Sequence, residues 1–334
     1  MIDIFNAIAL FTNFVIVPAI AYGSQIALGA LGVTLIFGIL RFANFAHGDL
    51  MAFGTAVTIL LTWWLQSLGI GFGVLPTALL ALPVGIAAAA GLTLATDRVV
   101  YRFYRNKRVA PVIMTMASVG VTFIYGGLVR ILIGSDDQRF ADGERFLISA
   151  AGFREMTGLA EGVAVKVTVL VTVVATVLAM GWLFWFLART RTGKAMRAFS
   201  DNEDLALLSG INPERVVLFC WLLAAGLATL AGTLYGLDKS FKPFNYVQLL
   251  LPFFAAAMVG GIGNPLGAVV GGYLVAFSEV AITYPYKRVL EYLGFRPEGL
   301  VQLISVDYKY AVSFVILVLV LLLRPTGIFK GRVL

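Results

Sequence analysis

The sequence predicts an all-α fold, a polytopic bundle of transmembrane helices in which some helices are broken or re-entrant. Hydrophobic residues fill 60% of the 334 positions and charged residues only 13%, which is about half of the charged share of a typical soluble domain. The mean hydropathy is +0.92. A soluble core of this size could not bury so much apolar surface. The many apolar runs of about 20 residues have the length that a helix needs to cross a bilayer.

These apolar runs follow one another along the chain and predict eight to ten membrane segments, with nine as the expected number. They lie at 8–40, 48–66, 74–96, 109–134, 163–187, 214–237, 247–284 and 310–323. The first run is long enough for two short helices, or for one helix and a re-entrant piece. The stretch at 260–265 is rich in glycine and ends in proline, so it predicts two shorter helices within the seventh run. We expect residues 1–334 to form a single transmembrane domain.

Clusters of lysine and arginine between the apolar runs predict the orientation of the chain, because such clusters favour the cytoplasmic side. They lie at 98–108, at 189–197 and near the C-terminus, at 324–332. In the loop at 135–162 the acidic residues outnumber the arginines, and we expect this loop to face outward. One apolar run separates this loop from each neighbouring basic cluster, which agrees with that orientation. The C-terminus is therefore predicted to be cytoplasmic, and the net charge of +7 reflects topology and not nucleic acid binding.

Catalytic, redox and metal-binding patterns are absent from the sequence. It contains one histidine and one cysteine, and its apolar runs hold no clustered carboxylates. The phosphate-binding pattern G-x-x-x-x-G-K-[ST] does not occur, because Ala195 follows the only Gly-Lys pair. We therefore expect no catalytic residue, no metal ligand and no cofactor in this chain. If ATP energises transport, another subunit must bind it.

The stretch RFANFAHGDL, at 41–50, places several polar side chains between two apolar runs. Non-helical backbone at membrane depth is tolerated only where it is buried in protein or lines a wet cavity. Asn44 is expected to cap the helix that follows, and Asp49 lies in the first turn, where a negative charge suits the helix dipole. Gly48 permits close packing. His47 stands alone, so a structural or gating role is favoured over direct contact with a substrate.

A second break contains Gly260, Gly261 and Gly263. The sequence after it, GYLVAF at 272–277, resembles GDLMAF at 48–53, which follows the first break. Interrupted segments at corresponding places in two halves of a chain indicate a transport pathway. We therefore expect Asn44, His47 and Gly48 of the first break and the three glycines of the second to form a translocation pathway or hinge.

Glu279 is the only charged residue between 264 and 284. An ionisable group inside the membrane is a functional candidate by default, and we include Glu279 among the pathway residues. A buried, hydrogen-bonded group near the outer face is the alternative interpretation, and the sequence favours it somewhat.

The cytoplasmic stretch at 189–212 has the pattern of one or two short amphipathic helices. Ser200 and Glu203 fit a capping box, which predicts the start of a second helix. Gly210 suits the C-terminal cap of that helix, and Pro213 suits the first turn of the next membrane helix. Such an element between two membrane helices can dock on a partner protein, although an ordinary solvated loop is an equally good interpretation.

Motifs along the chain resemble those of bacterial branched-chain amino acid ABC transporter permeases, specifically the H-type subunit. They occur in the same order from about residue 22 to the C-terminus: NFAHG at 44–48, DRVVYR at 97–102, RTGKAMRA at 191–198, LSGIN at 208–212, GGIGNPLGA at 260–268 and RPTGI at 324–328. Each motif alone is modest, whereas the ordered set is highly specific.

The resemblance implies a multi-pass permease subunit of an ATP-driven importer in the bacterial inner membrane. Its expected partners are a second, M-type permease, two ATPase subunits that bind ATP and Mg, an extracytoplasmic solute-binding protein and membrane lipid. The binding protein is expected to dock near the loop at 135–162. The resemblance also implies that residues 189–212 receive the motion of the ATPase, with the coupling residues Gly193, Arg197, Glu203, Asp204 and Gly210.

Two other functions remain as alternatives. A stand-alone, ion-coupled secondary transporter would need paired carboxylates or a proton relay in the membrane, and Glu279 has no obvious partner. A membrane-embedded enzyme is disfavoured, because no polar cluster forms a catalytic set. The resemblance leaves the solute open between branched-chain amino acids and other small polar solutes, because relatives carry urea, short amides, other amino acids and aromatic or dicarboxylic acids.

Overall fold

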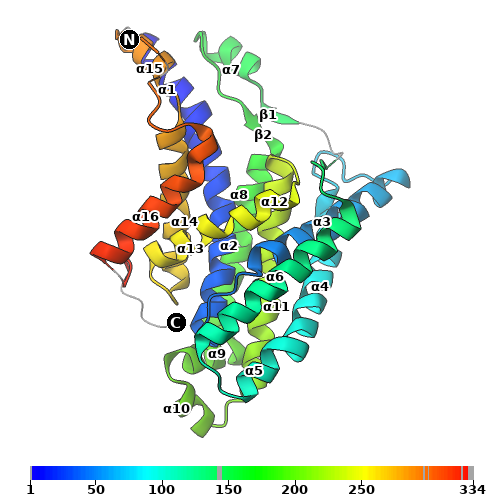
Figure 1. Ribbon diagram of the computed structural model, residues 1–334. Coiled ribbons are helices and arrows are strands. Elements are labelled where there is room, and N and C mark those ends of the chain that lie inside the picture. The colour runs from blue at the N-terminus through cyan, green and yellow to red at the C-terminus, as the bar shows by residue number, and fades with distance from the viewer. Residues whose placement is uncertain (1, 141–144, 296–297, 300, 325, 330–334) are drawn as a thin grey trace.

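The computed structural model describes residues 2–140, 145–295, 298–299, 301–324 and 326–329 (Figure 1). Its elements are α1 (Ile2–Phe11), η1 (Thr12–Ile16), α2 (Val17–Leu40), α3 (His47–Ser67), α4 (Ala78–Thr96), η2 (Asp97–Tyr101), α5 (Arg102–Asn106), α6 (Pro111–Ile133), β1 (Phe146–Ile148), α7 (Ala150–Thr157), β2 (Val165–Lys166), α8 (Val167–Arg189), α9 (Arg191–Asp201), α10 (Glu203–Leu208), α11 (Pro213–Asp238), α12 (Pro243–Gln248), α13 (Leu250–Gly260), α14 (Pro265–Thr283), α15 (Lys287–Tyr292), η3 (Val306–Tyr308) and α16 (Lys309–Leu323). Among the described residues, nine helical stretches are long and apolar enough to cross a membrane. The predicted helical bundle is therefore confirmed.

Helix α2 forms the centre of the bundle, with α8, α11, α13 and α14 packed against it. Nearly all of its residues are buried. Small residues allow its neighbours to approach closely, as is typical of helix interfaces in membranes. At Gly272 of α14, for example, an added Cβ would lie 2.7 Å from the Cα of Ala27. At Gly29, an added Cβ would lie 2.4 Å from the ring of Phe253 on α13.

The first apolar run forms one long helix, so neither predicted division of this run is correct. Helical structure continues through 38 residues, Asp3–Leu40, with the π-helical turn η1 inside it. At about 1.5 Å per residue it measures roughly 57 Å, which is more than one crossing of a hydrocarbon core of about 30 Å needs. The N-terminal part packs against α15. There the Oδ1 of Asn6 accepts hydrogen bonds from the backbone N–H groups of Ala160 and Glu161, which anchors the end of the 135–162 loop.

The predicted break in the seventh apolar run is confirmed. Helix α13 ends at Gly260 and α14 begins at Pro265. The turn between them uses two left-handed glycines, with φ of 100° at Gly261 and 85° at Gly263. Asn264 caps α14, since its Oδ1 accepts the N–H of Gly267 over 3.1 Å.

The two ends of the bundle carry different surface elements (Figure 1). Helices α5, α9 and α10 lie at one end, and α7, β1, β2 and α15 lie at the other. We call these the α10 end and the α7 end. The basic clusters at 98–108 and 189–197 therefore lie opposite the described part of the acidic loop at 135–162, as the orientation argument requires.

Candidate functional site

Two hydrogen bonds join the end of α2 to α9. The guanidinium of Arg41 donates to the backbone carbonyl of Ser200. The Oγ of Ser200, a fully buried residue, donates to the carbonyl of Gly38 over 2.8 Å. Arg41 ends α2 in the left-handed conformation, with φ of 58°, which residues other than glycine rarely adopt. We call Gly38, Arg41 and Ser200 the clamp.

Asn44 does not cap α3, so this expectation is wrong. Helix α3 begins at His47, and its N-cap position is Ala46, whose side chain has no oxygen to offer. The Oδ1 of Asn44 instead accepts the N–H of Ala46 over 3.1 Å and the hydroxyl of Tyr101 over 3.3 Å. Asn44 is thus buried in the turn before the helix and ties that turn to η2.

Tyr101 belongs to a buried network that reaches the basic cluster at 98–108. Its ring stacks on Trp221 of α11, with 5.2 Å between ring centroids. The Nε1 of Trp221 donates to the Oδ1 of Asp97 over 2.8 Å, and Arg105 donates to the same oxygen over 2.8 Å. Sequence reasoning missed this network. Its only signal was a carboxylate at the inner end of an apolar run, next to the basic cluster.

His47 is fully buried between helices. Its ring lies edge-on to Phe253 of α13, with 6.2 Å between centroids. On the α2 side, a Cβ added to Gly32 would lie 2.6 Å from the His47 Cε1. Neither ring nitrogen meets hydrogen-bond geometry with a described residue, and the backbone of Gly29 lies nearby. These contacts favour packing over ligand binding at His47.

Both breaks depend on contacts that only glycine permits. A Cβ added to Gly48 would lie 2.8 Å from the carbonyl oxygen of Tyr246 in α12, and one added to Gly260 would lie 2.0 Å from the carbonyl oxygen of Gly267. The next glycine, Gly261, packs against Gly327. A Cβ added to Gly327 would lie 2.5 Å from the Cα of Gly261. Backbone therefore meets backbone at each break.

The first and second breaks face one small cavity. It encloses about 30 Å³ and is lined by Ala43 from the first break and Ile262 from the second. Phe37 of α2 and Phe254 of α13 complete its apolar wall. The structure thus brings the two predicted hinge elements to the same place in the bundle.

The stretch at 189–212 folds into two short helices, α9 and α10. The predicted capping box is wrong, because Ser200 belongs to α9 and is used in the clamp. Asn202 caps α10 instead, and its Oδ1 accepts the N–H of Leu205 over 3.0 Å. Gly210 follows α10 in the left-handed conformation expected of it, with φ of 80°, and Pro213 begins α11 as predicted.

Two of the five expected coupling residues face the protein itself. A Cβ added to Gly193 would lie 2.2 Å from the carbonyl oxygen of Phe186, so α8 and α9 meet here at backbone distance. The guanidinium of Arg197 donates to the carbonyl of Ala188 over 3.5 Å. Gly193 and Arg197 therefore hold α9 against α8.

Helix α10 presents both charged and apolar side chains to its surroundings. Glu203 and Asp204 are exposed in its first turn, where negative charge suits the helix dipole. The leucines of the same helix are also exposed, with Leu205 at 60%, Leu207 at 40% and Leu208 at 85%. Sequence reasoning singled out the charges and missed the leucines.

Glu279 lies apart from both breaks. It is 1% exposed, and its Oε1 accepts a hydrogen bond from Ser313 of α16. It lines a cavity of about 250 Å³ together with Tyr22 and Lys309, which we call the polar cavity. The alternative interpretation, a buried hydrogen-bonded group, agrees with this geometry, but the open cavity adds a feature that sequence reasoning did not anticipate.

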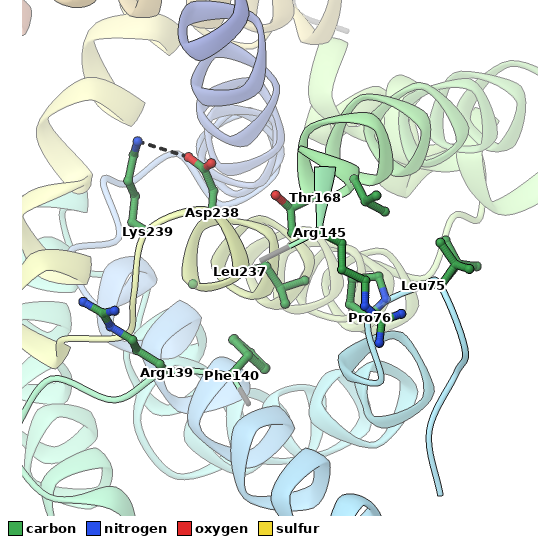
Figure 2. Close-up of a pocket in the computed structure, with 12 residues that line it drawn as sticks. Leu75, Pro76, Arg139, Phe140, Arg145, Thr168, Leu237, Asp238 and Lys239 are labelled. Carbon is green, nitrogen blue, oxygen red and sulfur yellow. Dashed lines mark ion pairs between the residues drawn. The ribbon is translucent and has the colours of Figure 1, made fainter. Parts of the chain in front are cut away.

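A third cavity lies at the α7 end (Figure 2). It encloses about 200 Å³ and is lined by residues of the 135–162 loop, including Arg139 and Arg145, and by the end of α11. Lys239 pairs with Asp238 there, with 3.3 Å between Nζ and Oδ2. Lys239 also lines the polar cavity, so the two cavities share one cationic side chain.

Known proteins are similar to this chain over almost all of its length. Residues 15–321 match the family described as "Branched-chain amino acid transport system / permease component". The chain is 31% identical over 317 residues to the "High-affinity branched-chain amino acid transport system permease protein LivH" of Escherichia coli (strain K12), covering 94% of this chain and 93% of the relative. It is 29% identical over 320 residues to the corresponding protein BraD of Pseudomonas aeruginosa, with 95% of each covered.

A probable LivH of Methanocaldococcus jannaschii is 29% identical over 316 residues, covering 93% of this chain and 90% of the relative. These matches set aside the stand-alone secondary transporter and the enzyme. The chain belongs to the permease components of branched-chain amino acid transport systems, and it is a multi-pass transport subunit of an ATP-binding-cassette importer.

Proposed function

We propose that this permease forms half of a translocation pathway for branched-chain amino acids, together with an M-type permease as the other half. Two ATPase subunits, loaded with ATP and Mg, and an extracytoplasmic solute-binding protein complete the importer. The binding protein releases the solute at the outer face, ATP closes the ATPase dimer, and the membrane helices then change which side is open. The chain performs no covalent chemistry in this cycle.

The orientation that fits this cycle places the α10 end in the cytoplasm. The basic clusters in α5 and α9 lie at that end, and the described part of the loop at 135–162 lies at the α7 end. Lysine and arginine favour the cytoplasmic side. This orientation puts the cavity of Figure 2 in reach of the binding protein. The predicted cytoplasmic C-terminus, with Lys330 and Arg332, lies outside the described residues.

Helix α10 is the part of the permease that meets the ATPase. Its exposed leucines lie beside two exposed carboxylates, Glu203 and Asp204, and a buried apolar anchor with a polar rim is the usual composition of an interface. Three further residues support this surface, since they set the position of α9 and the end of α10: Gly193, Arg197 and Gly210. Together these residues form the coupling region.

The clamp carries the proposal, because it joins the coupling region directly to the first break. Ser200 is in α9, and both of its hydrogen bonds go to the last turn of α2. A displacement of α9 therefore moves Arg41, and Arg41 begins the non-helical turn that holds Asn44. From there the motion reaches His47 and Gly48 at the start of α3. On the other side of the small cavity, the second break can change its backbone conformation in the same step, because it contains Gly260, Gly261 and Gly263.

The docking step can be tested with the reconstituted importer. Replacing Leu207 and Leu208 together by asparagine is expected to weaken binding of the ATPase subunits at least about tenfold, since each buried leucine contributes about 1.5–3 kcal/mol. Co-purification of the ATPase and substrate-stimulated ATP hydrolysis would both fall. Met156→Asn is a matched control, because Met156 is as exposed as Leu208, both at 85%, but lies in α7.

Two outcomes decide the test. Loss of the ATPase in the leucine variant, with full retention in Met156→Asn, supports the docking surface. Unchanged co-purification and unchanged coupling in the leucine variant would show that α10 is an ordinary solvated helix.

A further inference from the structure

A further cavity lies at the α10 end of the bundle, where the end of α4, its extension η2 and the start of α11 come together. It encloses about 330 Å³. Three exposed arginines line it: Arg98, Arg102 and Arg215. Leu94 and Leu218 form another part of the same wall. The cavity therefore combines a cationic side with an apolar side.

The two carboxylates of this cavity already have partners within the protein. Both oxygens of Asp97 accept hydrogen bonds from the guanidinium of Arg105, over 2.8 Å and 3.3 Å. Glu214 pairs with Arg102, with 3.5 Å between Oε2 and Nε. The other oxygen of Glu214 lies 3.6 Å from a guanidinium nitrogen of Arg105. These contacts engage both carboxylates.

Two of the three lining arginines have no counterion in the part of the chain that the structure describes. No ion pair or side-chain hydrogen bond there holds the guanidinium of Arg98 or of Arg215. Both residues are exposed, so their charges are accessible to a ligand. A guanidinium binds phosphate through two parallel hydrogen bonds, and the cationic side therefore suits a phosphate group.

The cavity lies at the level where the two helices change from apolar to charged. Asp97 is the first charged residue of the candidate span Ala78–Asn106, and Arg215 is the last before the apolar stretch of α11. The 29 residues of that span measure roughly 43 Å at about 1.5 Å per residue, which exceeds a hydrocarbon core of about 30 Å. Its charged end therefore reaches the headgroup region of a bilayer. Val99, 77% exposed between the charged side chains, fits a surface that contacts lipid.

We propose that this cavity binds an anionic phospholipid. The phosphate accepts hydrogen bonds from Arg98 and Arg215, and an acyl chain lies along Leu94 and Leu218. Basic pockets between membrane helices are typical sites for such headgroups. Free phosphate would contact only the arginines and leave the two leucines uncovered, so the apolar side favours a lipid. The site is independent of the solute and of the importer cycle.

The test uses the complete permease–ATPase complex in detergent and measures the Kd of phosphatidylglycerol by native mass spectrometry. The wild type should bind this lipid more tightly than phosphatidylcholine. Arg98→Gln combined with Arg215→Gln should raise the Kd at least about tenfold, because charge-assisted hydrogen bonds to the phosphate are lost. Arg189→Gln combined with Arg191→Gln is the matched control. It removes the same charge from two exposed arginines at the same end that do not line the cavity, and the Kd should stay at the wild-type value.

A second variant keeps every arginine. Leu218→Asn should raise the Kd of phosphatidylglycerol several-fold, because the acyl chain loses apolar contact. Leu251→Asn in α13 is its matched control, since Leu218 is 41% and Leu251 42% exposed, and it should leave the Kd unchanged. A wild-type Kd in Leu218→Asn would overturn the assignment to a lipid.

Three further outcomes would also overturn the proposal. The first is an equal Kd of the wild type for phosphatidylglycerol and phosphatidylcholine. The second is displacement of the lipid by an equal concentration of sn-glycerol 3-phosphate, which carries the phosphate without acyl chains and would indicate a site for a free anion. The third is loss of the ATPase subunits in the double arginine variant with an unchanged lipid Kd, which would assign the arginines to the ATPase.

Discussion

The clamp and the polar cavity use buried polar groups in opposite ways. In the clamp, the buried Ser200 is fully engaged, with its carbonyl and hydroxyl both bonded to the end of α2. In the polar cavity, Glu279 is just as buried, yet its Oε2 meets hydrogen-bond geometry with no described residue. Fully satisfied buried groups fix the position of the elements that carry them, whereas an incompletely satisfied group does so less firmly.

The cavities beside the two regions also differ in size and polarity. Next to the first break the cavity is apolar and about 30 Å³, which leaves room for little more than a side-chain adjustment. The polar cavity is about 250 Å³ and carries both signs of charge. The comparison teaches that the clamp and the polar cavity are separate parts of this permease, so variants should separate their effects.

The largest effect is expected from overfilling the second break. Gly260→Val places a branched side chain where a Cβ alone would lie 2.0 Å from the backbone oxygen of Gly267, and backbone cannot move aside as a side chain can. We expect a loss of about 3 kcal/mol or more, with little folded permease recovered. Size-exclusion profiles and thermal unfolding of the detergent-solubilised protein measure this directly.

Gly120→Val is the matched control for this substitution. Gly120 lies in α6, and among the described residues no atom outside its own stretch of helix lies within 4 Å of an added Cβ. A normal yield for both variants would mean that α13 and α14 do not meet as closely as described, and the break could not then be a fixed hinge.

An intermediate effect is expected in the buried network of Tyr101, Trp221 and Asp97, which contacts Asn44 through Tyr101. Trp221→Phe keeps the aromatic stack on Tyr101 but removes the donor to Asp97, which should cost about 1–3 kcal/mol. The unfolding temperature should fall while leucine binding by the permease stays unchanged. Trp182→Phe, at a side chain 53% exposed, should alter neither. A change in leucine affinity in Trp221→Phe would show that this network also contributes to solute binding.

The smallest effect is expected at the end of α10. Gly210→Ala meets no steric obstacle, so only its left-handed backbone, with φ of 80°, is strained, at a cost of about 1–2 kcal/mol. Substrate-stimulated ATP hydrolysis should fall modestly, since the docking surface shifts. Gly181→Ala in α8, another open position, should be silent. Equal activity in both variants would remove Gly210 from the coupling region.

The sequence predicted the architecture well because membrane helices carry their signal in composition and length. The nine candidate spans of the described residues, the break at 260–265 and the two short helices in 189–212 all follow from apolar runs and local turn residues. The first run was divided wrongly, because its length suggested two segments. Asn6 and Asn13 in this long helix accept backbone hydrogen bonds from Ala160 and Ala164, and a single sequence cannot reveal such contacts.

The candidate site was predictable only in part. The glycines at 48, 260, 261 and 263 can be recognised from local pattern, since their role is local. The clamp joins residues about 160 positions apart, and the polar cavity draws Tyr22, Glu279 and Lys309 from three distant helices. Such pairings depend on tertiary packing. The capping interpretations of Asn44 and Ser200 failed for the same reason, since both side chains have long-range partners that local pattern cannot show.

The most direct test of the clamp is Arg41→Gly. Glycine adopts the left-handed conformation of Arg41 without strain, so the substitution removes the guanidinium and keeps the turn. Arg108→Gly is the matched control, because Arg108 also has a positive φ, of 48°, but is not part of the clamp.

The measurement is the number of leucine molecules taken up per ATP hydrolysed by the complete reconstituted importer. The clamp account predicts a ratio about tenfold lower in Arg41→Gly, since a charge-assisted hydrogen bond contributes roughly 1.5–3 kcal/mol, and a wild-type ratio in Arg108→Gly. A wild-type ratio in Arg41→Gly would contradict the account, because the coupling region would then move the pathway by another route.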